Sequence, residues 1–238
     1  MATVCLFRDD AYLKECEAIV AGVTSNGGVV LDRTVFYAMS GGQPADRGTF
    51  TLSDGQTVPI DNVVYADAGK TEIAHVPAGG PAPFAPGTTL RATIDWAPRY
   101  ARMRMHTALH LLSAVLPYPV TGGSIGEKES RLDFDIPEAG LDKGKIDEAL
   151  AAMIAADAEV TSRWITDAEL EANPGLVKTM AVKPPMGTGR VRLIEIKGYD
   201  LQPCGGTHVA RTGEIGAVQV TQIEKKGKQN RRVRLALV

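Results

Sequence analysis

The sequence is poor in cysteine and in aromatic residues, and it lacks a long apolar run. Its 238 residues include 3 cysteines, an odd number at irregular spacing, which argues against a disulfide framework and favours a reducing compartment. No uninterrupted apolar run approaches the roughly 18 residues of a membrane-spanning helix. Asp9 and Asp10 make the N-terminus acidic too early for a secretory signal. We therefore expect a cytoplasmic protein that has no membrane partner.

The net charge of −2 is small, but the charges are unevenly distributed. Residues 1–95 carry 6 Lys and Arg against 11 Asp and Glu, whereas residues 96–238 carry 20 against 17. Phosphate backbones are held by local basic patches and not by overall charge. The composition therefore does not exclude a nucleic-acid partner for the second part of the chain.

Residues 1–95 have the pattern of a small β-barrel or sandwich domain. Asn26-Gly27 lies between two apolar runs and is a strong signal for a hairpin turn. Further short apolar runs follow, punctuated by glycine and proline, and a Pro- and Gly-rich loop over 77–87 precedes the last one. The expected strands are 18–23, 28–32, 48–52, 58–64, 72–76 and 88–95.

Residues 96–238 have the pattern of an α+β domain, so the whole chain is expected to be α+β with an N-terminal barrel. Helical spacing of apolar residues begins near Arg99 and ends at Pro117. Further helices are expected over 142–160 and 165–173, and a turn over 122–124. The expected strands are 131–136, 191–196, 199–203, 215–224 and 231–238.

Three of the four histidines and one cysteine fall in two short segments. His106 and His110 are four residues apart in the first expected helix, so one helix face presents both imidazoles. Cys204 and His208 have the same spacing. Either pair alone is a weak signal, because such histidines often only pack and Gly205-Gly206 suits a simple turn. Together the two pairs complete a tetrahedral set and predict a metal site.

Nitrogen and sulfur ligands favour Zn²⁺ over Mg²⁺ or Ca²⁺. The two pairs lie far apart in the sequence, so the metal would join an early helix to a late β-region of a folded domain, unlike the metal of a small zinc finger. Four protein ligands are typical of a closed structural site, whereas a catalytic zinc keeps one position open. The sequence leaves both possibilities open.

Further motifs accompany the ligand pairs, whose settings are Met-His-Thr-Ala-Leu-His-Leu-Leu and Cys-Gly-Gly-Thr-His-Val. In this order over nearly the whole chain, the motifs resemble the editing domain of alanyl-tRNA synthetase and its freestanding relatives, the AlaX family of alanyl-tRNA editing proteins. The resemblance is to the mid-length type, which has a barrel domain and an editing domain. The accompanying motifs are Gly-Gly-Gln at 41–43, Gly-Ser at 123–124, and the segments 131–134 and 212–216.

The resemblance implies hydrolysis, in trans, of tRNA for alanine that wrongly carries serine, and sometimes glycine. A hydrolytic second step is needed because an alanine pocket cannot strongly reject a slightly larger or smaller side chain. By motif match, Zn²⁺ would be bound by His106, His110, Cys204 and His208, and it would activate a water or orient the aminoacyl group. The implied catalytic residues are His106, His110 and Cys204, with Gln43 reaching toward the tRNA end or the edited residue.

Two positions depart from the family pattern. Many relatives carry a hydroxyl residue where this chain has Leu109, and several carry glutamine where it has Thr121. Those polar groups are thought to help hold the serine, so the resemblance does not decide between serine and glycine. The candidate hydroxyls for substrate binding are those of Thr107, Thr121, Ser124 and Thr207.

Basic residues near the motifs are candidates for contacts with tRNA phosphates, although a solvated charged face is the simpler alternative. These candidates are Arg99, Arg102 and Arg104 in the first helix and Lys225, Lys226 and Lys228 in the last hairpin.

Three other functions fit parts of the pattern. An editing hydrolase of the threonyl-synthetase type would use similar ligand pairs, but the Gly-Gly-Gln motif and the Cys-Gly-Gly-Thr-His-Val wording argue against it. A zinc-stabilised RNA-binding module would bind tRNA without deacylating it. A hydrolase like a release factor is suggested by Gly-Gly-Gln alone, and it would not need the four ligands.

Overall fold

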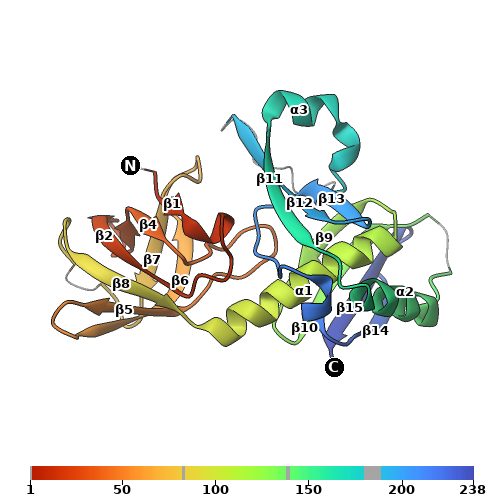
Figure 1. Cartoon of the computed structure of the whole chain (residues 1–238), viewed down its shortest axis with the longest axis horizontal. Helices are drawn as coiled ribbons and strands as arrows, with labels where there is room; N and C mark the ends of the chain where they lie inside the picture. The colour runs from red at the N-terminus through yellow and green to blue at the C-terminus, as the bar shows by residue number, and fades with distance from the viewer. Residues whose placement is uncertain (1, 82–83, 138–139, 180–188) are drawn as a thin grey trace. The chain divides into compact units, whose positions relative to one another are not determined.

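Figure 1 shows the chain in a computed structural model that describes residues 2–81, 84–137, 140–179 and 189–238. The chain divides into two compact units. The first unit consists of Met1–Ser40 and Pro44–Tyr100, and the second consists of Gly41–Gln43 and Ala101–Val238. The loop that carries the Gly-Gly-Gln motif therefore belongs to the second unit.

The first unit is a closed barrel of six strands in the order β2-β3-β7-β6-β5-β8, with antiparallel pairing throughout. The predicted hairpin is confirmed, because β2 pairs with β3 around a turn in which Gly27 has a φ of 80°. Residues 82 and 83 of the expected loop lie outside the described residues. Two further short strands, β1 and β4, pair with each other in parallel outside the barrel. The strands of the unit are β1 (Val4–Cys5), β2 (Glu15–Val23), β3 (Val29–Leu31), β4 (Arg33–Thr34), β5 (Gly48–Leu52), β6 (Thr57–Tyr65), β7 (Ile73–Pro77) and β8 (Thr89–Ile94).

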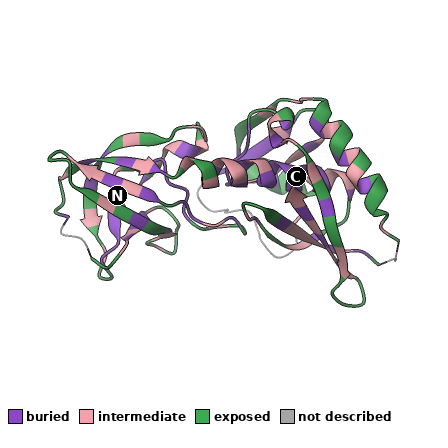
Figure 2. Ribbon diagram, turned by 90° about the horizontal axis from the view of Figure 1, so that it is seen from below, coloured by how far each residue is buried: buried purple, intermediate pink, exposed green. Residues whose placement is uncertain are grey.

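Buried residues alternate with more exposed ones along the barrel strands, as the purple segments of the ribbon in Figure 2 show. The buried residues form one hydrophobic core. In β2 the inward positions are Ala18 and Val20, whereas their neighbours are exposed or half-buried. His75 of β7 is also fully buried, with the rings of Phe36 and Phe50 centred 5.2 and 5.1 Å from its own ring. A polar imidazole in this core has to have both nitrogens hydrogen-bonded.

The second unit contains two antiparallel sheets and the C-terminal part of the long helix α1. The four-stranded sheet has the order β14-β15-β10-β9, with α2 beside β14, and the three-stranded sheet has the order β11-β12-β13 (Figure 1). The elements are α1 (Trp96–Val115), β9 (Val120–Ser124), β10 (Glu129–Asp135), α2 (Lys143–Ala155), β11 (Val160–Thr166), α3 (Asp167–Ala172), β12 (Arg190–Ile196), β13 (Asp200–Pro203), β14 (Val218–Lys225) and β15 (Asn230–Leu237).

Two sequence predictions in this unit were wrong. Residues 122–124 belong to strand β9 and do not form a turn. The helix expected over 142–160 ends at Ala155, because Asp157 takes a φ of 47° and the chain then enters β11, which pairs with β12 along its whole length. The short helix predicted next begins later than expected, at Asp167, where Thr166 and Glu169 form a capping box.

The described residues contain no helix that is long and apolar enough to cross a membrane.

The buried His75 predicts a pH-dependent stability. Its Nδ1–H donates to the Val29 carbonyl at 2.9 Å, and its Nε2 accepts from the Thr34 hydroxyl at 2.8 Å, so the folded barrel holds the neutral ring. Burial lowers the pKa of His75 from 6.5 to about 4. Between these values the unfolded chain binds a proton that the folded chain does not, so stability is lost as the pH falls, by as much as about 3 kcal/mol.

We expect a His75→Gln variant, which keeps a donor and an acceptor but cannot titrate, to lose less stability than the wild type between pH 6.5 and 4. Urea denaturation at several pH values measures the free energy of unfolding of both proteins. An identical pH dependence in the two would contradict this assignment.

Candidate metal centre

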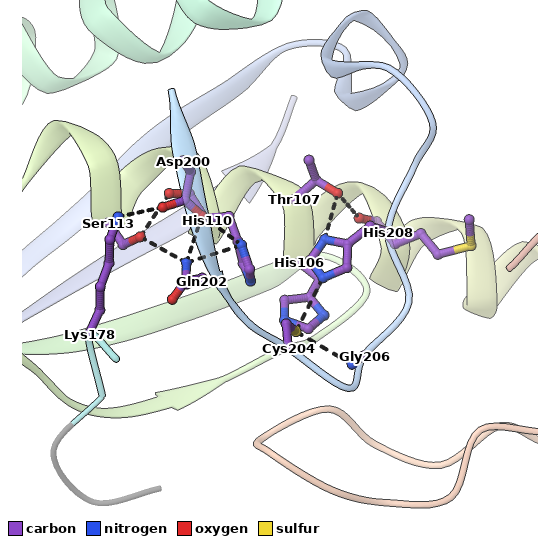
Figure 3. Close-up of polar contacts among 11 residues, drawn as sticks. His106, Thr107, His110, Ser113, Lys178, Asp200, Gln202, Cys204, Gly206 and His208 are labelled. Atoms are coloured by element: carbon purple, nitrogen blue, oxygen red, sulfur yellow. Dashed lines mark hydrogen bonds and ion pairs between the residues drawn. The ribbon is translucent and has the colours of Figure 1, made fainter. Parts of the chain in front are cut away.

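The four predicted ligand residues lie together in the second unit. One ligand atom from each of His106, His110, Cys204 and His208 lies within 4.8 Å of the others. The first two project from α1 and the other two from the loop after β13 (Figure 3). The Sγ atom of Cys204 lies 3.5 Å from Nε2 of His106 and 3.3 Å from Nε2 of His208. The structure thus brings a helix and a distant loop to one cluster of donor atoms.

The loop that carries Cys204 is held by hydrogen bonds to its backbone groups. The Cys204 N–H donates to the Arg192 carbonyl at 3.0 Å, which continues the pairing of β12 with β13. The Arg192 guanidinium donates to the carbonyls of Cys204 and Gly206 at 3.3 and 2.9 Å. The Gly206 N–H points to the Cys204 Sγ at 3.4 Å, a contact that favours the thiolate.

Each imidazole of the cluster uses its Nδ1–H as a donor. That of His110 donates to the Asp200 carboxylate at 2.9 Å. That of His106 donates to Oε1 of Gln43 at 3.0 Å, and the same oxygen accepts the Thr207 N–H at 3.2 Å, which fixes the orientation of the amide.

The third imidazole, that of His208, donates from Nδ1 to Thr107 Oγ1 at 3.1 Å. This direction follows because the single Thr107 hydroxyl proton is directed to the Met103 carbonyl at 3.0 Å, so the oxygen can only accept from the ring. Since each Nδ1 atom is engaged in this way, the Nε2 atoms are the ones available to bind an ion beside the sulfur.

Asp200 is itself held by a polar network that the sequence analysis did not predict. Lys178 forms an ion pair with its Oδ1 atom, and Gln202 donates to its Oδ2 atom at 2.8 Å (Figure 3). The spacing of these residues in the sequence could have indicated the network. Residues 200, 202 and 204 alternate along β13 and its extension, so their side chains lie on one face of the sheet. A supporting carboxylate of this kind fixes the tautomer and orientation of a metal-binding histidine.

The electrostatics of the cluster favour metal-binding protonation states for two residues and not for a third. Burial alone raises the pKa of the Cys204 thiol, but the adjacent His106 and His208 lower it well below the ordinary value. Burial, and then the proximity of His106, lower the pKa of His208. Burial also lowers the pKa of His110, but Asp200 and Cys204 raise it to about 9. Metal binding must therefore displace a proton from His110.

The donor set fits a metal ion that accepts nitrogen and sulfur ligands. The three histidines are buried, and Cys204 is half-buried as a residue. The supporting hydrogen bonds fix the orientations of the three rings, as a metal-binding site requires.

Gln43 and Thr107, which were expected to contact the substrate, both form hydrogen bonds with ligand imidazoles in the structure. The Gln43 side chain is buried, and its amide is engaged with His106 and Thr207, with Nε2 donating to Thr207 Oγ1 at 2.9 Å, so in this conformation it does not reach toward a tRNA end. The Thr107 hydroxyl is fully buried behind His208 and has no surface to offer a substrate. Thr207 is likewise fully buried.

The other candidate hydroxyls are not brought into contact with the ligands. Thr121 Oγ1 donates to the Asp133 carbonyl at 3.1 Å and accepts from Asn230 at 2.7 Å. Ser124 is exposed at the end of β9, next to Ile125, whose N–H donates to the Gly42 carbonyl at 2.9 Å. Leu109 is buried in α1.

The basic candidates of α1 are buried or half-buried, whereas those of the last hairpin are exposed. Arg99 is fully buried and donates from Nε to Asp46 at 2.9 Å and from Nη2 to the Val35 carbonyl at 2.6 Å, so its guanidinium is not presented to solvent. Arg102 is buried in an ion pair with Glu127 at 2.7 Å, and Arg104 donates to the Ile215 carbonyl at 2.8 Å. The residues exposed at the β14–β15 turn are Lys225, Lys226 and Lys228.

Both units have matches among known proteins. Residues 191–234 match the threonyl and alanyl tRNA synthetase second additional domain, and residues 2–98 match the class II (A) tRNA synthetases. The alanyl-tRNA editing protein AlaX-M of Methanosarcina acetivorans is 37% identical over 99% of both chains, and that of Saccharolobus solfataricus is 33% identical over 96% of both. The alanine–tRNA ligase of Korarchaeum cryptofilum is 36% identical over 94% of this chain and 25% of its own.

The close approach of Gly206 to His106 predicts a specific effect of substitution. A Cβ atom at Gly206 would lie 2.3 Å from Cε1 of His106 and 2.8 Å from Oε1 of Gln43, whereas one at Gly205 would meet none of the described residues within 4 Å. We expect Gly206→Ala to displace His106 and to weaken metal affinity by about 10- to 100-fold, the usual cost of losing a supporting contact. Competition with a chromogenic chelator measures the affinity, and Gly205→Ala is the matched control. Equal affinities for the two variants would contradict the prediction.

Proposed function

The chain belongs to the AlaX-M family of alanyl-tRNA editing proteins, and we propose that it hydrolyses tRNA(Ala) that carries serine or glycine. A protein that hydrolyses mischarged tRNA(Ala) in trans is an editing enzyme. The single observation that supports the proposal best is the cluster of one thiolate and three imidazoles, each with its Nδ1 atom fixed, in a chain that matches this family along its whole length. Such a protein acts on charged tRNA, so we place it in the cytoplasm.

We propose Zn²⁺ as the ion, held by Nε2 of His106, His110 and His208 and by Sγ of Cys204. The donor types support this choice, because hard cations such as Mg²⁺ prefer oxygen. When bound, the ion supplies Lewis-acid chemistry that stabilises negative charge on the oxygen atoms of the reacting ester.

The reaction joins the oxygen of a water molecule to the acyl carbon and breaks the bond from that carbon to the ribose oxygen. One water proton ends on the ribose oxygen, and the free amino acid and the uncharged tRNA leave. In this scheme Asp200, Gln43 and Thr107 are positioning residues, since each holds one ligand ring through Nδ1.

Among the hydroxyls expected to bind the substrate, Ser124 is the candidate that we retain. It is exposed, and it lies at the end of β9 where a Cβ atom on Gly42 would come within 2.8 Å of the Gly123 carbonyl. The Gly41–Gln43 loop therefore packs closely against β9. This packing places Ser124 near the loop that carries Gln43, the residue that positions His106.

The activity is tested with Ser-, Gly- and Ala-tRNA(Ala) as substrates. We expect deacylation of the first two, little of the third, and loss of activity with a chelator that zinc restores. Cys204→Ala removes a ligand and should lower the rate by more than about 100-fold, since even a lost supporting residue costs 10- to 100-fold. Cys16→Ala, at a half-buried cysteine of the barrel, is the control. Binding of tRNA without deacylation would instead indicate an RNA-binding module.

The exposed lysines of the last hairpin predict a salt-dependent contribution to tRNA binding. Reversing Lys225, Lys226 and Lys228 to glutamate should weaken binding and make it less sensitive to salt, by up to about one unit of slope per lost phosphate contact. A variant with Lys143, Lys145 and Lys197 reversed has the same net charge and is the control, because those residues are exposed elsewhere on the unit. Dissociation constants between 50 and 200 mM salt give the slopes. An unchanged slope would show that the hairpin is only a solvated charged face.

A further inference from the structure

A row of three residues crosses the three-stranded sheet and ends at the metal cluster. Trp164 of β11 pairs with Arg192 of β12, and Arg192 accepts the backbone hydrogen bond of Cys204 on the far side. Directly opposed residues in an antiparallel sheet present their side chains to the same face. Trp164, Arg192 and Cys204 therefore share one face.

The two faces of this sheet have different surroundings. The face opposite to Trp164 is apolar and forms a core with α3. The face that bears Trp164 also bears Gln202 and Asp200, which contact His110. Residues of the apolar core are Ile165, Leu170, Val191 and Leu193. Trp164 thus lies on the metal-binding face, which also carries the buried Ile194 and Ile196 of β12.

Trp164 is exposed, and the guanidinium of an arginine lies over its ring. Its relative exposure is 37%, and β11 is the edge strand of the sheet. The guanidinium carbon of Arg190, the diagonal neighbour on β12, lies 4.5 Å from the centre of the ring. An exposed aromatic ring beside an arginine is the combination that single-stranded RNA binders use, since the ring stacks on a base and the guanidinium attracts phosphate.

We propose that Trp164, with Arg190, forms a stacking platform for the base of the terminal RNA nucleotide, the one whose ribose carries the ester. Two strand spacings separate Trp164 from Cys204, which places their backbones about 10 Å apart. This span is comparable with the extent of one nucleotide, so an ester at the metal cluster and its own base on Trp164 can be bound together. The assignment rests on the proposed function for the identity of the ligand.

Direct contact is tested by fluorescence, without hydrolysis. In a Trp96→Phe background Trp164 is the one tryptophan left in the chain. Uncharged tRNA(Ala) with its complete 3′ end should quench this emission, and the same tRNA without its terminal nucleotide should quench it several-fold less. Equal quenching by both RNAs, or none by either, overturns the proposal.

Substitution tests the energetic contribution. Because stacking on one aromatic side chain changes binding substantially, we expect Trp164→Ala to raise KM for Ser-tRNA(Ala) about 10-fold while kcat changes less than about 2-fold. Trp164→Phe should restore most of the loss, since it keeps a ring. Tyr118→Ala is the matched control, because Tyr118 is a comparably exposed aromatic residue (38%) of the same unit. A KM for Trp164→Ala equal to that of the control overturns the platform.

The two proposals fail in different ways. If the protein deacylates no charged tRNA, but removal of the terminal nucleotide still reduces the quenching of Trp164 emission, the proposed hydrolysis is wrong and the stacking platform is supported. If Trp164→Ala deacylates Ser-tRNA(Ala) normally, and tRNA with and without its terminal nucleotide quenches the emission equally, the proposed hydrolysis is supported and the platform is wrong.

Discussion

Three imidazoles in the second unit must each keep Nδ1 bonded to a protein acceptor while Nε2 faces one sulfur, and much of the unit is arranged to satisfy this constraint. The acceptors come from three separate segments: Asp200 from β13, Gln43 from the Gly-Gly-Gln loop and Thr107 from α1 itself. Because a buried polar group without a partner is costly, each acceptor must also be satisfied in turn. The metal centre is therefore the centre of a hydrogen-bond network and not only a set of four ligands.

The network explains features that the ligands alone leave unexplained. Asp200 is buried, and its charge is compatible with burial because Lys178 and His110 both contact it. Arg192 is buried and donates to the carbonyls of the loop that follows β13. Gly206 has to lack a side chain since His106 occupies the space that a Cβ atom would need. These contacts place Cys204 at the end of a row on the sheet whose other end is an exposed indole.

The buried arginines show where sequence reasoning about charge fails. Arg99 and Arg102 precede His106 in α1 and look like a basic stripe for phosphates, yet both are buried. Arg99 is paired with Asp46, a residue distant in sequence, and it also donates to backbone carbonyls of the barrel unit. A sequence records the charge of a guanidinium but not its partner, and only the partner decides whether that charge is presented to solvent. The lysines of the last hairpin are exposed because a hairpin turn projects away from its sheet.

The sequence by itself determined the barrel strands, the long helix and the pairing of His106 and His110 with Cys204 and His208, because period-two and helical patterns and residue spacing are local properties. It also determined the family, through motifs in a fixed order. It did not determine that residues 160–166 form a strand, although β-branched and aromatic residues favour one there, because the helical patterns on both sides overlap the segment and pairing with β12 decides its structure. Likewise the partners of the three Nδ1 atoms and the burial of Gln43 were decided only by tertiary structure. Such contacts join residues far apart in the chain, and no local pattern encodes which acceptor a buried N–H will meet.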